Sequence, residues 1–99
     1  MDVYGLPYKE KLINDITLED SKVAVSGVVV SRGEGSFLID DGTGQIVINS
    51  ENAPNFEYIR VFGNVMDFNG TIVINADIMQ DLSRIDKKIY KRIKELMNK

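Results

Sequence analysis

The sequence of 99 residues contains no cysteine, no histidine and no tryptophan, and only two prolines. The lack of cysteine excludes disulfides and thiolate metal ligands. The lack of histidine removes the commonest general base and the commonest transition-metal ligand. No apolar run approaches the roughly 18 residues of a membrane span, and no N-terminal segment has a signal-peptide pattern. We therefore expect an intracellular protein, cytoplasmic in a prokaryote or nuclear, with no membrane association.

Catalysis has little support in the residues that are present. The acidic residues are scattered over predicted turns and strand ends. The segment Arg32-Gly-Glu-Gly35 leads into a strand rather than a helix, so it does not have the pattern of a phosphate-binding loop. Two adjacent carboxylates, Asp40 and Asp41, do not make a metal site without further ligands. We predict no enzyme activity, no catalytic residue, no metal and no cofactor.

Charge is distributed unevenly along the chain. Positions 1–83 carry five basic and thirteen acidic residues, a net charge of −8, whereas positions 84–99 carry seven basic and two acidic residues, a net charge of +5. The length fits a single domain. Phosphate binding depends on cationic surface, so any nucleic-acid hypothesis must account for an acidic body with a basic end.

Five apolar segments that alternate with a period of two predict an all-β core. They lie at 22–31, 36–40, 45–49, 58–66 and 72–78. A change of phase near Gly27 predicts a bulge or bend that lets the first segment serve two sheets. Ile72, Ile74, Ala76 and Ile78 alternate along the last segment.

Two short sequences that are typical of turns lie between these strands. The Asp-Asp-Gly-Thr-Gly sequence at 40–44 predicts a structural turn in which the aspartates accept local backbone N–H bonds. Asn69-Gly70 predicts the turn of a second hairpin. Upstream, the spacing of Leu12, Ile13 and Ile16 fits either one helical turn or an entering strand.

The C-terminal segment has the pattern of an amphipathic helix over 83–98. Ser83 is a candidate N-cap, with Asp86 completing a weak capping box. This helix packs on the barrel or on a partner, and its apolar width favours a partner. The predicted interface comprises Ile85, Ile89, Tyr90, Ile93, Leu96 and Met97. We therefore divide the chain into a lead-in arm at 1–21, a barrel at 22–80 and a helix at 81–99.

The order of the five strands, with a glycine in the first and the fourth, resembles an OB-fold, a five-stranded Greek-key barrel. The sequences Tyr58-Ile-Arg-Val-Phe-Gly, Phe68-Asn-Gly and Ile74-Asn-Ala-Asp-Ile, with the turn at 40–44, are similar to the middle subunit of replication protein A over about positions 22–98. The resemblance implies an all-β OB-fold with a C-terminal assembly helix, and a role in DNA replication and repair. Telomere-capping subunits and anticodon-binding OB domains share the pattern, so it specifies the fold better than the substrate.

The candidate nucleic-acid-binding residues are chosen by chemistry, because single strands are held by stacking on aromatic rings and by cations that follow the backbone. We predict stacking by Phe62 and Phe68, helped by Tyr58, and phosphate contacts from basic side chains. Polar strand residues add contacts to the backbone or base edges. The full predicted set is Lys22, Arg32, Phe37, Gln45, Asn49, Tyr58, Arg60, Phe62 and Phe68.

The leading hypothesis is a subunit that binds single-stranded DNA within a complex similar to replication protein A. Its expected partners are single-stranded DNA and another OB-fold subunit, or a second copy of the chain bound through the C-terminal helix. The acidic body motivates an alternative, an OB-fold adaptor that assembles with proteins through that helix. A further alternative is a module that binds RNA or tRNA.

Overall fold

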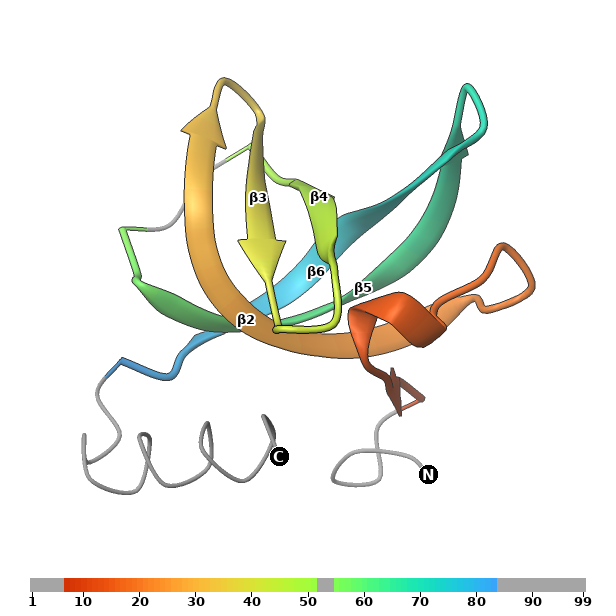
Figure 1. Cartoon of the computed structure of the whole chain (residues 1–99), viewed down its shortest axis with the longest axis horizontal. Coiled ribbons are helices and arrows are strands. Elements are labelled where there is room, and N and C mark those ends of the chain that lie inside the picture. Colours follow the sequence, from red (N-terminus) through yellow and green to blue (C-terminus); the bar gives the residue numbers. More distant parts are fainter. Residues whose placement is uncertain (1–6, 52–54, 84–99) are drawn as a thin grey trace.

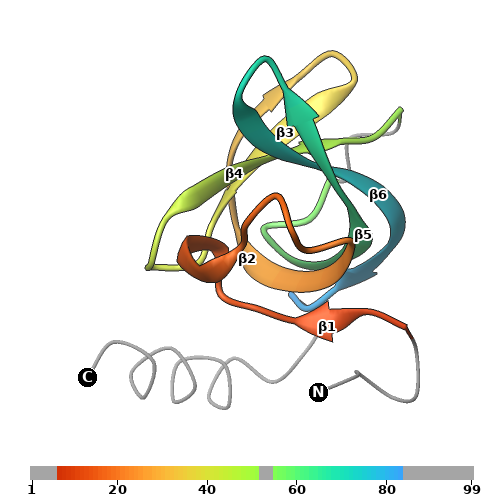
Figure 2. The ribbon, with the colours of Figure 1, turned by 90° about the vertical axis from the view of Figure 1, so that its right-hand side faces the viewer.

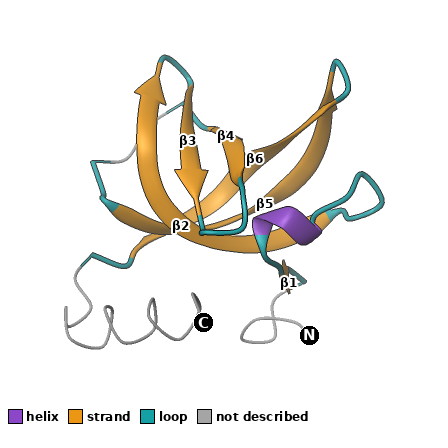
Figure 3. Cartoon of the chain, in the orientation of Figure 1, coloured by secondary structure: helices purple, strands orange, loops and turns teal. Residues whose placement is uncertain are grey.

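Valine and isoleucine, which fit a pleated and half-buried surface, fill the strands of the structure. The structure is a computed structural model that describes residues 7–51 and 55–83. Its strands are β1 (Lys9–Glu10), β2 (Lys22–Gly33), β3 (Ser36–Asp40), β4 (Gln45–Asn49), β5 (Tyr58–Phe68) and β6 (Thr71–Asp81), and a 3-10 turn, η1 (Ile13–Asp15), follows β1 (Figure 3). The segment around Ile13, for which the sequence left two possibilities, therefore contains both a short strand and a helical turn.

The strands form one sheet that closes on itself. Their order is β1-β2-β3-β4-β6-β5, and β2 also pairs with β5. The pairs are antiparallel except for β1 with β2 and β4 with β6, which are parallel. The strands β2 to β6 form the resulting barrel, in which β2 curves beneath the others (Figure 1). This topology is that of an OB-fold.

Strand β2 takes part in both halves of the barrel. Its first half, from Lys22 to Val28, pairs with β5, and its second half pairs with β3. A Cβ atom at Gly27 would lie 2.8 Å from the carbonyl oxygen of Asp40, so β3 can cross here only over a glycine. The register shift that the sequence predicts near Gly27 lies slightly further along, between Val29 and Ser31.

The inward faces of the strands build one apolar core. Ile13 and Ile16 extend this core from the lead-in segment. The other buried members are Val23, Val25, Phe37, Ile39, Ile46, Ile48, Ile59, Val61 and Ile74. The lead-in segment therefore contributes side chains that close one end of the barrel.

The turn between β3 and β4 fastens η1 to the barrel. One carboxylate oxygen of Asp41 accepts the backbone N–H of Thr43 at 2.8 Å, and the other accepts the N–H of Ile13 at 2.7 Å. Gly42 has a φ of 92°, which favours glycine. Figure 2 shows η1 beside this loop. The prediction of a structural turn is confirmed, and the turn has the added task of holding the lead-in segment.

One residue of the last strand lies on the opposite face from the one its spacing predicts. A register shift between Phe62 and Gly63 pairs Gly63 with Ala76 and Phe62 with Ile78, so Asp77 is an extra residue in β6. The extra residue reverses the alternation. Ile78 is therefore 46% exposed, and Met79 packs against the core in its place.

The predicted fold class is wrong in its C-terminal α-helix. Residues 7–51 and 55–83 form an all-β barrel without an α-helix. Ser83, the expected N-cap, has a different role: its hydroxyl accepts the backbone N–H of Tyr58 at 3.2 Å and ties the end of β6 to the start of β5. Positions 84–99, with the interface residues predicted there, lie outside the described residues. In the part that is described, no helix has the length and apolar character needed to cross a membrane.

Candidate nucleic-acid interface

The structure does not bring the predicted binding residues together at one place. Two of the aromatic rings are inside the protein. Tyr58, Arg60 and Arg32 lie near the start of β5 and the end of β2, whereas Phe68 lies at the far end of β5. Arg60 and Phe68 are eight residues apart, which is about 26 Å along a strand. The predicted set therefore divides into separate groups.

Phe37 and Phe62 are unavailable for stacking, because each is only 2% exposed. Phe37 belongs to the main core. Phe62 points outward from β5, as the alternation predicts, but the ring of Tyr8 covers it edge-on with 5.4 Å between ring centroids. Ala24 completes this small cluster. Both phenylalanines are therefore removed from the candidate interface.

A polar network lies beside this cluster and occupies Lys22. The Tyr8 hydroxyl donates to Asp77 at 2.8 Å, and this hydrogen bond is the main reason that the pKa of Tyr8 is raised. Lys22 Nζ lies 3.1 Å from Asn64 Oδ1 and 3.8 Å from Asp77 Oδ2. It also lies 5.2 Å from the centre of the Tyr8 ring. Lys22 therefore binds groups of the protein itself, and much of its charge is compensated.

The group near the start of β5 is also engaged by the protein. Arg60 Nε donates to the Ser26 hydroxyl at 3.3 Å, and Arg32 Nη2 donates to the carbonyl oxygen of Phe56 at 2.7 Å. Tyr58 is half-buried, and burial, with a smaller contribution from Asp41, raises its pKa. These contacts hold the side chains close to the barrel surface. The two arginines are positioned, but neither projects as a free cation.

Phe68 differs from the other predicted aromatics, because its side chain is 65% exposed. It is the last residue of β5 and pairs with Thr71 across the β5–β6 hairpin. Asn69 and Gly70, with φ of 54° and 88°, form the tight turn, and the Gly70 N–H donates to Asp67 at 2.8 Å. This turn confirms the predicted hairpin. It presents the ring at the tip of the hairpin.

An apolar row lies on the outer surface beside this tip. Leu38 pairs with Val47, Val47 with Val73, and Val73 with Met66, so the row crosses four strands. Val73 is buried in its middle, and Met66 at its end is 44% exposed. Because Met66 and Phe68 are two residues apart on β5, they share this outer face. We name Leu38, Val47, Val73 and Met66 the apolar row.

A second row, two residues further along, carries side-chain amides. Asn49 pairs with Asn75, and Asn75 pairs with Asn64. Asn49 Nδ2 donates to Asn75 Oδ1 at 3.1 Å. We name Asn49, Asn64 and Asn75 the amide row. Of the residues in the two rows, only Asn49 is among those predicted from the sequence, because the rows form only through the cross-strand register.

Two open pockets lie on either side of the short seam between β4 and β6. These two strands pair over three residues each, 47–49 of β4 with 73–75 of β6. Beyond Asn49, a pocket of about 570 Å³ has two carboxylates in its lining, from Glu51 and Asp77. Before Val47, a second pocket of about 460 Å³ lies among η1, the β3–β4 turn and the β5–β6 turn. Gln45 lines this second pocket, and its Nε2 donates to Asp40 at 3.0 Å.

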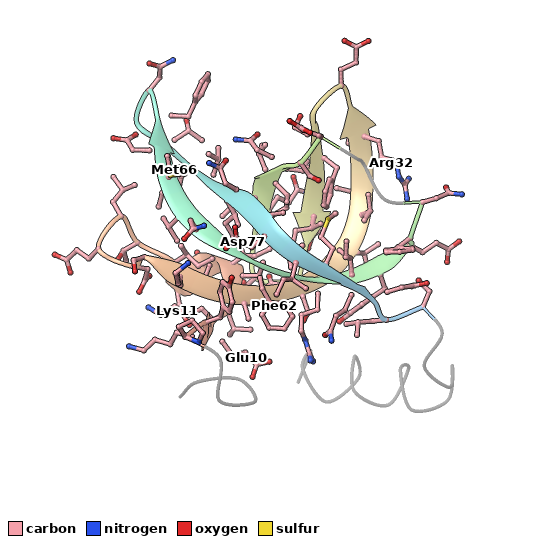
Figure 4. The ribbon with its side chains drawn as sticks, turned by 180° about the vertical axis from the view of Figure 1, so that it is seen from behind. Glu10, Lys11, Arg32, Phe62, Met66 and Asp77 are labelled. Carbon is pink, nitrogen blue, oxygen red and sulfur yellow. The ribbon has the colours of Figure 1, made fainter. Side chains whose placement is uncertain are left out.

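The two hairpin tips flank the outer surface that carries these features. Figure 1 shows the β2–β3 and β5–β6 tips rising at the same end of the molecule, with β3 and β4 between them. Figure 4 places Arg32 and Met66 on these two different arms, with Phe62 at the base. We name the outer surface of β3, β4 and β6, together with Met66 and Phe68, the candidate face.

The described part of the chain has a net negative charge. The described residues include twelve acidic and five basic side chains. Lys11 pairs with Asp20 at 3.0 Å, on the lead-in segment. Among these residues, no group of three or more acidic side chains is placed to hold a metal ion. The chemistry of the face is therefore that of an exposed ring, apolar strand positions and neutral amides.

The comparisons with known proteins rest on structure. No protein-family model matches the sequence, and no curated protein matches it. A chain of the S. pombe Stn1–Ten1 complex is similar with a TM-score of 0.62 and 16% identity, over 94% of this chain and 93% of that one. Replication protein A of U. maydis, solved bound to single-stranded DNA, gives a TM-score of 0.60 and 15% identity, over 92% and 91%. The hypothetical protein ygiW of E. coli gives 0.63 and 13%, over 75% and 90%.

These identities are too low to transfer a function, but the agreement over most of each chain establishes the fold. The suggestion of an OB-fold from the strand order and its glycines is confirmed. The chain is an OB-fold barrel that resembles the OB-fold subunits of replication protein A and of Stn1–Ten1.

Proposed function

We propose that this chain binds single-stranded nucleic acid on the candidate face, with DNA as the preferred strand. The observation that carries the proposal is the exposure of Phe68, whose side chain is 65% exposed and lies two residues beyond Met66 on the same face of β5. Exposed apolar side chains that gather in one patch, as Phe68 and Met66 do here, are typical of interaction sites. Nucleobases stack on such rings, and every base offers a flat face for the contact.

The proposed mechanism relies on stacking more than on charge. One base stacks on Phe68, and its neighbours lie along the apolar row towards the β2–β3 tip. The amide row offers hydrogen-bond donors and acceptors that a base edge or sugar accepts without net charge. Arg32, on the β2–β3 arm, donates to the Phe56 carbonyl oxygen and adds a positive charge at that end of the face. The complex of the U. maydis protein with single-stranded DNA supports this direction, because that protein shares the fold.

The proposal is tested by fluorescence anisotropy with a labelled strand of about 20 nucleotides, longer than the site of one OB-fold. Replacement Phe68→Ala is expected to weaken binding by about 5- to 150-fold, the value of one stacked base. Ile78→Ala is the matched control. Ile78 is also an exposed apolar residue, 46% free, but it lies on the Phe62 side of the barrel. Equal affinities for the wild type and Phe68→Ala would exclude this mechanism. Competition between DNA and RNA of one sequence would identify the preferred strand.

We further propose that the chain acts as a subunit beside another OB-fold chain. The likeness to a chain of the Stn1–Ten1 complex and to replication protein A, which forms a heterotrimer, supports this proposal. The acidic character of positions 1–83 also suits contact with a basic partner. Light scattering of the purified chain, alone and with a candidate OB-fold partner, tests it. A chain that stays monomeric with every such partner would contradict it.

A further inference from the structure

The pocket before Val47 has no role in the stacking mechanism proposed above, yet part of its lining comes from β4 and β6, two strands of the candidate face. It lies where β4 and β6 have not yet begun to pair, between Gln45 at the start of one strand and Thr71 at the start of the other. Phe68 is the cross-strand partner of Thr71. The ring proposed to stack on the strand is therefore a direct neighbour of a residue that lines this pocket.

The lining of the pocket combines an apolar floor with a neutral polar rim. The floor is built from four isoleucines, Ile13, Ile16, Ile46 and Ile72. The rim carries the side chains of Asn14, Gln45 and Thr71, together with Gly44 and Gly70. Its lining residues include no charged side chain, unlike the pocket at the other end of the seam.

The rim has hydrogen-bonding capacity that the fold does not use. The backbone N–H of Asn14 bonds to Thr43 at 3.1 Å, but its side-chain amide has no hydrogen-bond partner in the described structure. The Gln45 amide donates to Asp40 and keeps its carbonyl oxygen available. Asn14 and Gln45 come from separate segments, η1 and β4, and converge on one opening.

We propose that this pocket takes a single nucleobase of the bound strand, inserted edge-first or face-down between η1 and the β5–β6 turn. The inference rests on the proposed function and names the part of the strand that this site recognises. An apolar floor accepts the flat faces of a heterocycle, and amide groups on the rim recognise its polar edge. A phosphate is a poor occupant, because the lining has no cation and the Asp41 carboxylate lies nearby in the β3–β4 turn.

The glycines support this occupant. Gly70, with a φ of 88°, has no atom within 4 Å of the position that a Cβ would take, so the backbone is open at this side of the rim. A Cβ at Gly44 would meet only the Ile13 side chain, at 3.5 Å. These two positions therefore put no side chain in the way of a planar ligand at the rim. The volume of about 460 Å³ falls within the range of small-ligand sites.

The first experiment follows the isoleucine methyl groups of the full chain by NMR while a free nucleoside, adenosine or cytidine, is added. The expected result is a saturable shift of the Ile13, Ile46 and Ile72 methyls. Ile59, fully buried and absent from this pocket, is the internal control and is expected to stay unchanged. Nucleosides that leave all three pocket methyls unshifted would overturn the inference.

The second experiment measures the affinities for homopolymers of adenine, cytosine and thymine by anisotropy. The wild type is expected to separate the best from the worst base by about fivefold, the value of one good hydrogen bond. Asn14→Ala is expected to reduce that ratio to within about twofold while Phe68 still supports binding. Asn55→Ala, an exposed asparagine outside the pocket, is the matched control. An unchanged ratio in Asn14→Ala would contradict base recognition at this rim.

The outcomes also separate the two proposals. If strand binding depends on Phe68 but the isoleucine methyls of the pocket do not shift, the proposed function stands and the proposal of a base-binding pocket is wrong. If the methyls shift but no strand binds, the pocket is a nucleoside site and the proposed function is wrong. If neither strand binding nor methyl shifts are observed, both proposals are wrong.

Discussion

Phe62 and Phe68 lie on the same strand and point to the same face, yet one is 2% exposed and the other 65% exposed. The difference comes from the lead-in segment. Tyr8 packs edge-on against Phe62, and β1 runs beside β2 at this end of the barrel (Figure 2). Phe68 lies beyond the reach of β1, at the tip of a hairpin. Two identical residues six positions apart therefore have different tasks, one in stability and the other in the proposed binding.

This contrast shows how a small barrel keeps an outward aromatic ring. The cover over Phe62 is secured by the Tyr8–Asp77 hydrogen bond and by Lys22 over the Tyr8 ring. At the other end, the tight turn at Asn69 and Gly70 holds Phe68 without covering it. The lead-in segment therefore buries one outward ring, whereas the other ring stays exposed at the hairpin tip.

The largest expected effect is on stability, from Phe62→Ala. Removing a buried ring deletes its apolar contacts and leaves a cavity, so the free energy of unfolding should fall by about 3–5 kcal/mol. Phe68→Ala, on the exposed ring of the same strand, should change it by less than about 0.5 kcal/mol. Urea unfolding of the two variants and the wild type measures both values. Similar losses in the two variants would abolish the distinction between them.

The next expected effect is on affinity, and it distinguishes stacking on the Phe68 ring from simple hydrophobic contact. Phe68→Leu keeps an apolar side chain but has no π-face, so it should weaken strand binding by several-fold to about 100-fold. Phe68→Tyr keeps the ring and should bind within about twofold of the wild type. Anisotropy titrations, with circular dichroism to verify folding, measure the series. If Phe68→Leu binds as tightly as Phe68→Tyr, hydrophobic contact rather than stacking holds the strand.

The fold was accessible from the sequence, because each barrel strand carries its own alternation and each hairpin its own turn residues. Val23 and Val25, Ile46 and Ile48, and the Asn69-Gly70 turn are local signals of this kind. The binding site was less accessible. That Phe62 points outward followed from the alternation, but its cover by Tyr8 joins residues 54 positions apart in the sequence. The apolar row and the amide row depend on the register between β4 and β6, which no short motif encodes.

The error in Ile78 has the same origin. A strict alternation from Ile72 predicts an inward side chain, but the extra residue at Asp77 turns Ile78 outward. That extra residue also brings the Asp77 carboxylate to Tyr8, Asn64 and Lys22. The bulge therefore replaces Ile78 by Met79 at the core, and it places the Asp77 carboxylate where it binds Tyr8 of the lead-in segment.

The salt dependence of binding gives a smaller expected effect. Lys11 and Lys22 pair with aspartates, and Arg32 and Arg60 already make hydrogen bonds to the protein, so we expect few phosphate contacts from the barrel. With one or two phosphate contacts, the slope of log K against log salt should be about −0.7 to −1.4 for a single strand. Titrations at three or more salt concentrations measure it. A slope steeper than about −3 would assign most phosphate contacts to the basic positions 84–99 instead.

The smallest expected effect comes from the hydroxyl that secures the cover of Phe62. Tyr8→Phe keeps the ring but removes the hydrogen bond to Asp77, so the midpoint of thermal unfolding should fall by only a few degrees at pH 7.

The same bond raises the pKa of Tyr8 above its ordinary value of 10.0. Tyr8 therefore stabilises the fold below pH 10, and this contribution is lost as the pH rises from 10 through the raised pKa. Unfolding of both proteins at pH 7 and pH 11 measures the difference. The wild type should lose more stability than Tyr8→Phe over this interval, because the variant has no phenol to ionise at this position. Tyr58, whose pKa is also raised, is present in both proteins and cancels in the comparison. Parallel losses would mean that the Tyr8 ring alone, and not its bond to Asp77, holds the lead-in segment over Phe62.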